Sequence, residues 1–327
     1  MAFGVLFDAL SPSGANARLS ILIFHRVLPV PDSLFPGEVD AIAFDQICAW
    51  VSRWFHVLPL DVAVQRMQSA TLPSRAMAIT FDDGYADNHD IALPILRRHG
   101  LTATFFISTG FLDGGQMWND TVIESIRRCP LPRIDLSHTV ASALGILHLS
   151  SLDDRRAAIG TVIAATKYLP SDERAAWVAA LASRSQTVPG EPQMMRSEQV
   201  RALCRAGMGI GAHTVSHPIL ARLNNDQAHV EIADGRRHLE DIVGKRVGLF
   251  AYPNGKPKVD YHEESVRIVR ELGFDAAVST HWGSARRGDD VFQLPRFTPW
   301  DRSRWRFGMR LARNLRAGPA ASLPQPA

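Results

Sequence analysis

Residues 78–85 read AITFDDGY, an apolar run that ends in two adjacent aspartates, Asp82 and Asp83, followed directly by glycine. Two neighbouring carboxylates repel each other, and removing both from water is costly unless a cation or a proton compensates. Aspartate and glycine also suit tight turns, so the same letters are typical of a solvated loop. The stretch therefore predicts either a turn after a buried strand or a site prepared for a metal ion or a proton.

Short apolar runs alternate with helical patterns on both sides of this stretch. Strands are expected at 19–27, 76–81, 102–108, 208–214, 246–253 and 274–280, and helices at 43–55, 88–100, 197–207, 225–244 and 261–273. Strands that alternate with helices are typical of parallel β–α units, so an α/β fold is predicted. A polar, helix-rich region at about 120–195 shows no clear strand pattern, and we expect a helical insertion there.

Chemically reactive side chains cluster directly after the predicted strands. In parallel α/β barrels the active site lies at the carboxyl ends of the strands, so residues that are distant in sequence meet on one rim. We therefore expect a single site that draws on His25, Asp82, Asp83, His213, His217, Tyr252, Pro253, His281 and Trp282.

The sequence HTVSH places His213 and His217 four residues apart, close enough for both imidazoles to reach one ion. Alone this spacing is weak, because a chain with 12 histidines can produce it by chance. Two histidines and one carboxylate, however, form a facial set that binds a divalent ion and leaves positions open. If Asp83 is the ligand, Asp82 is free to act as a base on a water whose pKa the metal lowers to about 7. The sequence therefore predicts metal-assisted hydrolysis.

Composition narrows the class of protein. The 327 residues are 46% hydrophobic and 21% charged, which suits one large α/β domain with an inserted part. No run reaches the roughly 18 apolar residues of a membrane helix, and the first residues, MAFGVLFDALSPSG, make a poor secretory signal. We expect a cytoplasmic protein.

The three scattered cysteines, which form no CxxC, indicate neither a disulfide framework nor a thiolate zinc site.

Together, TFDDGY and HTVSH resemble the first two motifs of the polysaccharide deacetylases, the NodB-homology family of carbohydrate esterases. The similarity covers most of 19–112 and 197–298. The resemblance implies a distorted (β/α) barrel, over residues 1–298, that removes acetyl groups from N-acetylated sugars. It also implies a catalytic base at Asp82 and a divalent metal ion held by Asp83, His213 and His217.

The chain departs from the later motifs of that family. The third motif has an arginine that braces the base, but FAYPNG (250–255) places Ala251 there while keeping Pro253. The last motif is Leu-x-His, whose histidine protonates the leaving amine, but LPR (294–296) keeps Leu294 and ends in Arg296. A guanidinium stays protonated, so we expect Arg296 to bind substrate or stabilise an oxyanion. We expect Tyr252, Pro253, Trp282 and Leu294 to contact substrate, and His25 or His281 to be the acid.

These residues predict a metal-dependent de-N-acetylase of a polysaccharide or a glycolipid precursor, whose partner is an N-acetylated glycan or a lipid-linked sugar. Zinc is the expected ion, with cobalt and nickel as alternatives. Two other functions stay open: an amidohydrolase of small non-sugar amides or imides, and a carbohydrate-binding homologue without turnover.

The segment 299–327 is a basic tail with an Ala/Pro-rich end. From Arg296 onward the chain has seven arginines and one acid, a local charge of +6 against a total of +3, so residues 1–295 carry −3. This distribution argues against a nucleic-acid-binding body. Arginines interleaved with tryptophan, methionine and leucine over 299–318 suit either a helix on the inner, anionic face of a membrane or a helix packed on the barrel.

Overall fold

The computed structural model describes residues 2–187, 190 and 192–317. The Ala/Pro-rich end of the predicted tail therefore lies outside the described residues. The chain divides into two compact units, and each is described by itself. The larger unit contains residues 1–31, 37–113 and 194–327, and the smaller contains 32–36 and 114–193. Among the described residues, no helix is both long and apolar enough to cross a membrane.

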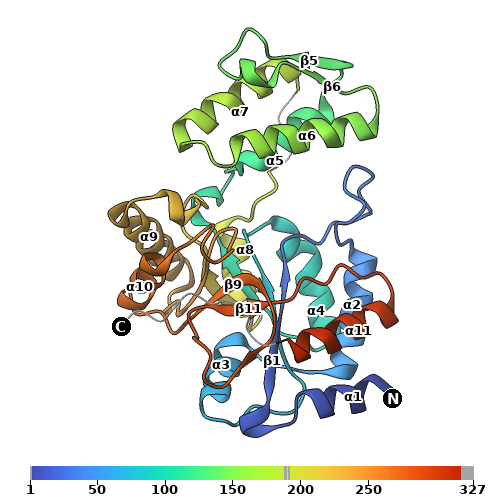
Figure 1. Ribbon diagram of the computed structural model, residues 1–327, viewed down its shortest axis with the longest axis vertical. Coiled ribbons are helices and arrows are strands. Elements are labelled where there is room, and N and C mark those ends of the chain that lie inside the picture. The colour runs from blue at the N-terminus through green and yellow to red at the C-terminus, as the bar shows by residue number, and fades with distance from the viewer. Residues whose placement is uncertain (1, 188–189, 191, 318–327) are drawn as a thin grey trace. The chain divides into compact units, whose positions relative to one another are not determined.

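The larger unit is built on one sheet, visible in Figure 1. Its strands lie in the order β10 (Ala285–Arg286), β1 (Arg18–Phe24), β3 (Ala76–Phe81), β4 (Thr104–Ile107), β7 (Gly209–Ala212), β8 (Leu249–Ala251), β9 (Ala276–Trp282) and β11 (Leu294–Arg296), with β2 (His56–Val57) beside β3. Neighbouring strands are parallel, apart from the antiparallel pair of β1 and β10.

The sheet closes on itself one residue after β11. The Phe297 amide donates to the Ile21 carbonyl at 2.7 Å, and the Ile23 amide donates to the Phe297 carbonyl at 3.1 Å. These bonds join the end of β11 to β1 in parallel. The result is the predicted distorted (β/α) barrel, and the carboxyl ends of its strands share one rim.

Helices surround the sheet of the larger unit. They are α1 (Ala2–Leu10), α2 (Ala41–Trp54), α3 (Leu60–Gln68), α4 (Leu93–Arg98), α8 (Ser197–Arg205), α9 (Asn225–Val243), α10 (Glu263–Glu271) and α11 (Arg304–Arg316), with a π-helical turn at Asn88–Ala92 and 3₁₀ turns at Gly14–Asn16, Thr109–Phe111 and Leu220–Arg222. The strands β1 and β3 are apolar almost throughout because both faces are buried, one inside the barrel and one under helices. Each fully buried Leu, Ile or Phe contributes roughly 1.5–3 kcal/mol.

The smaller unit contains α5 (Trp118–Arg128), α6 (Leu152–Thr166) and α7 (Ser171–Ser185), a 3₁₀ turn at Ser142–Leu144, and an antiparallel hairpin of β5 (Arg133–Asp135) and β6 (Ile146–His148). Its own apolar core includes Val122, Ile159 and Leu181. Arg127 donates two parallel hydrogen bonds to Asp32, at 2.6 and 2.9 Å, which tie the segment 32–36 to α5. The sequence predicts a helical insertion with no clear strand, and the hairpin corrects this, because three-residue strands are too short to show a period of two.

Candidate active site

The DDG turn ends β3 and separates the two aspartates. Asp83 has a φ of +75° and Gly84 a φ of +97°, so both lie in the left-handed region that favours glycine. A Cβ added at Gly84 would lie 2.9 Å from Cγ2 of Ile107 on β4. The turn therefore requires glycine after the aspartates. It directs Asp82 to a guanidinium and Asp83 to two imidazoles.

The loop after β7 carries both histidines and is braced from two sides. Ser108 Oγ donates to the His213 carbonyl at 2.8 Å. Glu231 on α9 accepts hydrogen bonds from the amides of Val215 and Ser216, at 3.0 and 2.9 Å. His217 itself has a φ of +53°, an uncommon conformation that such bracing maintains. Sequence analysis did not identify Glu231 as part of the site, because it lies in the middle of a helical pattern.

Asp83, His213 and His217 form a group that could hold a metal ion, as predicted from the sequence. Their ligand atoms all lie within 4.8 Å of one another. Asp83 Oδ1 is 3.4 Å from Nε2 of His213 and 3.3 Å from Nε2 of His217. This oxygen is buried and makes no hydrogen bond to any described residue, which is costly unless a cation lies beside it. The donor set fits one divalent ion.

Hydrogen bonding and burial prepare the two imidazoles for a metal. His213 Nδ1 donates to the Ala251 carbonyl at 2.7 Å, so the lone pair of this ring is on Nε2, facing Asp83. Burial lowers the pKa of His217 to about 4, so this ring is neutral at pH 7. Burial also disfavours the charged form of His213, but the nearby carboxylates of Asp83 and Asp82 outweigh this and raise the pKa of His213. Protons therefore compete with a metal at His213 first.

We expect zinc, cobalt or nickel to raise the melting temperature of the metal-free protein, because a bound ion stabilises only the folded state. His217→Ala should weaken binding by more than the roughly 10–100-fold that indirect changes around a metal cost. Affinity should also fall with acidification, since His213 must lose its proton to bind. Calorimetric titration from pH 5 to 8 measures both effects. His229→Ala, at an exposed position on α9, should bind like the wild type, and equal affinity of the two variants would contradict the assignment.

Arg296, which we expect to bind substrate or stabilise an oxyanion, lies against Asp82. Its Nη1 and Nη2 donate to the two carboxylate oxygens at 2.7 and 2.6 Å, and its Nε donates to the Ser279 carbonyl at 2.8 Å. Arg296 is 1% exposed and Asp82 is 2% exposed. Such a bidentate pair fixes the plane of the carboxylate. Burial alone would raise the pKa of Asp82, but the charges of Arg296 and His213 hold it below its ordinary value.

Of the two histidines predicted as proton donors, His25 interacts with the aspartates electrostatically. Its charge contributes to lowering the pKa of both Asp82 and Asp83. Asn88 Nδ2 donates to the His25 carbonyl at 2.9 Å, and Asp87 accepts from the Val27 amide at 3.1 Å, so this loop is held in place. The sequence analysis did not identify Asp87 and Asn88 as part of the site, because they follow the DDG turn in a polar stretch that indicates only the start of a helix.

His281 lies in β9 and is partly buried. Its Nε2 has no hydrogen-bond partner among the described residues, and burial lowers its pKa.

The other residues that were expected to contact substrate lie at different depths. Tyr252 is fully buried, its hydroxyl donates to the Phe292 carbonyl at 3.0 Å, and its ring stacks on Tyr261 at 3.9 Å. Pro253 is buried, and Leu294 is fully buried in the apolar cluster that also contains Ala251. Trp282, at the end of β9, is the partly exposed member of this group.

Comparison with known proteins connects these features to other chains. A family model described as polysaccharide deacetylase matches residues 69–129 and 163–277, more than half of the chain. The protein YxkH of Bacillus subtilis (strain 168) is 21% identical over 291 residues, which cover 86% of this chain and 71% of YxkH.

Solved structures share the fold. The deacetylase PplD of Streptococcus pyogenes, determined in complex with acetate, superposes with a TM-score of 0.58 at 18% identity, covering 86% of this chain and 92% of its own. IcaB from Ammonifex degensii superposes with a TM-score of 0.57 at 18% identity, covering 94% and 99% of the two chains. At such identities the likeness concerns the fold alone.

Proposed function

Because this chain belongs to the polysaccharide deacetylase family, we propose that it is a metal-dependent hydrolase that removes N-acetyl groups from a polysaccharide or a glycolipid precursor. One observation carries the proposal: an ionised, buried carboxylate, Asp82, directly precedes Asp83, one of the three residues of the metal set, in the turn after β3. A base next to a metal set is the arrangement that hydrolysis of an unactivated amide needs.

The residues divide the reaction between them. Asp83, His213 and His217 would hold a divalent ion, which when bound lowers the pKa of water from about 15.7 to about 7 and polarises a carbonyl. Asp82 accepts the proton of the attacking water while the new C–O bond forms at the acetyl carbon. Arg296 keeps Asp82 ionised and oriented, and the carboxylate has lone pairs left for the water. The C–N bond then breaks, acetate leaves, and the sugar nitrogen requires a proton.

We expect His25 to supply that proton. Arg296 cannot, since a guanidinium does not give up its proton in proteins. His25→Ala should reduce turnover by roughly 10²-fold or more and remove the alkaline limb of the pH–rate profile, while metal affinity stays unchanged. His281→Ala is the matched comparison. If that variant loses the limb instead, the donor is His281, and if both variants keep it, neither histidine is the acid.

Substrate class is tested by acetate release from N-acetylhexosamine oligomers with added zinc, cobalt or nickel. Turnover of small cyclic amides in place of the oligomers would identify a small-molecule amidohydrolase. Binding of the oligomers to the protein without acetate release would identify a carbohydrate-binding homologue. The proposal expects acetate release that requires a divalent ion.

A further inference from the structure

The C-terminal helix α11 is fixed on the body of the larger unit together with α1. Its inner face buries Phe307, Leu311 and Leu315 in the main core. Gly308 lets α1 approach closely, since a Cβ added there would lie 2.5 Å from the Phe3 ring. The surface that these two helices present is therefore a built part of the fold. It is not a loose tail.

The outer face of α11 combines cations with large apolar side chains. At 3.6 residues per turn, the exposed residues that follow Arg304 fall within an arc of about 100°. Trp305 is 64% exposed and Met309 is 47% exposed. The exposed stripe, named here the α11 face, consists of Trp305, Arg306, Met309, Arg313 and Arg316.

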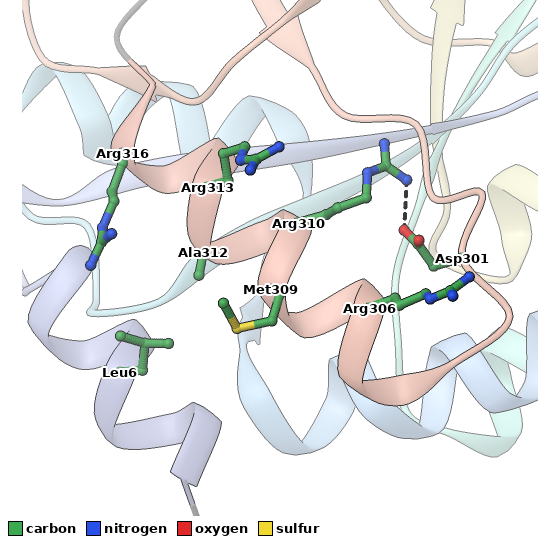
Figure 2. A pocket seen from close by; sticks show the side chains of 8 residues that line it. All are labelled: Leu6, Asp301, Arg306, Met309, Arg310, Ala312, Arg313 and Arg316. Carbon is green, nitrogen blue, oxygen red and sulfur yellow. Dashed lines mark hydrogen bonds and ion pairs between the residues drawn. The ribbon is translucent and has the colours of Figure 1, made fainter.

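Beside this face, α1 and α11 line a cavity of about 440 Å³, shown in Figure 2. Met309 and Ala312 of α11 and Leu6 of α1 contribute apolar walls. The acid in its lining, Asp301, is already paired with Arg310 at 2.6 Å. The cavity is therefore apolar in its walls and cationic at its edge.

The arginines of this segment fall into two groups. Three have internal partners: Arg302 pairs with Asp40, Arg304 lies over the Trp54 ring at 5.3 Å, and Arg310 pairs with Asp301. The other three, Arg306, Arg313 and Arg316, line the cavity. Their guanidinium groups make no hydrogen bond, ion pair or ring contact with any residue that the structure describes. The first group holds the segment in place, whereas the second leaves three uncompensated charges on one face.

We propose that the α11 face binds an anionic phospholipid surface. Lipid phosphates would pair with Arg306, Arg313 and Arg316, and Trp305 and Met309 would enter the interface between headgroups and acyl chains. A soluble anion accounts for the charges but leaves the exposed tryptophan and methionine unexplained. Nucleic acid calls for basic residues across a wider surface, whereas residues 1–295 carry −3.

The test is co-sedimentation with vesicles of phosphatidylcholine alone or mixed with phosphatidylglycerol. The protein should pellet only with the anionic vesicles, and less at high salt, because salt screens surface charges. Replacing Arg306, Arg313 and Arg316 by glutamine should weaken binding on the order of 100-fold, since each basic residue near an anionic membrane contributes about fivefold. Point variants are preferable to deletion of 299–327, which would remove buried residues of the core.

A matched control removes the same charge elsewhere. Arg97, Arg205 and Arg287 are exposed on α4, on α8 and after β10. Their triple glutamine variant should bind like the wild type, while lysine at the three α11 positions should restore most of the affinity. Equal pelleting of the two glutamine variants would overturn the proposal, as would binding of inorganic phosphate without any binding to anionic vesicles. Circular dichroism confirms that each variant is folded.

Discussion

Replacing Asp82 by asparagine is expected to lower turnover by at least about 10²–10⁴-fold, the scale of a positioned general base. The amide keeps the shape of the side chain but cannot take a proton from water. Metal affinity should persist, because Asp83, His213 and His217 are unchanged. Acetate release and calorimetric metal titration on the same preparation separate the two effects.

Stability must be measured alongside, because the change also leaves the Arg296 charge buried without its partner. Breaking a buried pair in this way costs about 3–5 kcal/mol. Asp32→Asn is the matched control, since Asp32 receives the same two-bond pairing from Arg127 within the smaller unit and is not one of the proposed reacting groups. That variant should lose stability and keep its turnover. Asp82→Asn with turnover within about tenfold of the wild type would contradict the base assignment.

The parts of this fold that the sequence predicts are those whose signals are local. β3 was predicted at 76–81 and lies at Ala76–Phe81, because a strand buried on both faces is a continuous apolar run. α9 was predicted at 225–244 and lies at Asn225–Val243, since Asn224 caps its start and Gly244, with a φ of +68°, ends it. The metal set was likewise predicted, because Asp83 lies in one short motif, TFDDGY, and both histidines lie in another, HTVSH.

The pairing of Arg296 with Asp82 depends on closure of the barrel and has no local signal. The two residues are 214 positions apart, and β11 has three residues, one of them proline. The family resemblance expects an arginine at position 251 on β8, where this chain has a fully buried alanine. The structure shows the guanidinium supplied from β11, at the position where the resemblance expects the acid. The motifs alone show two separate departures, Ala251 in place of an arginine and Arg296 in place of a histidine. In the closed barrel, Arg296 takes the place beside the base that the arginine at position 251 is expected to fill.

Arg296→Gln should therefore impair the base without touching the metal set. Burial favours the neutral form of Asp82, and the nearby charge of Arg296 is the largest opposing contribution that holds its pKa low. Without that charge the pKa of Asp82 rises. Since the proposed base Asp82 can accept a proton only when ionised, the acidic limb of the profile of kcat/KM against pH should move to higher pH. Activity lost near neutrality should partly return as the pH is raised.

The matched control is Arg127→Gln, which breaks the equivalent pair with Asp32. Both variants should lose stability, but Arg127→Gln should leave the acidic limb in place. Arg296→Lys keeps the positive charge, so the acidic limb of its pH profile should stay near that of the wild type. It loses the two-bond geometry, so kcat should fall because the Asp82 carboxylate is misoriented. An unmoved limb and near-normal turnover in Arg296→Gln would show that Arg296 serves only to fill the core. A shifted limb with intact metal affinity would establish that β11 supplies the group that prepares the base.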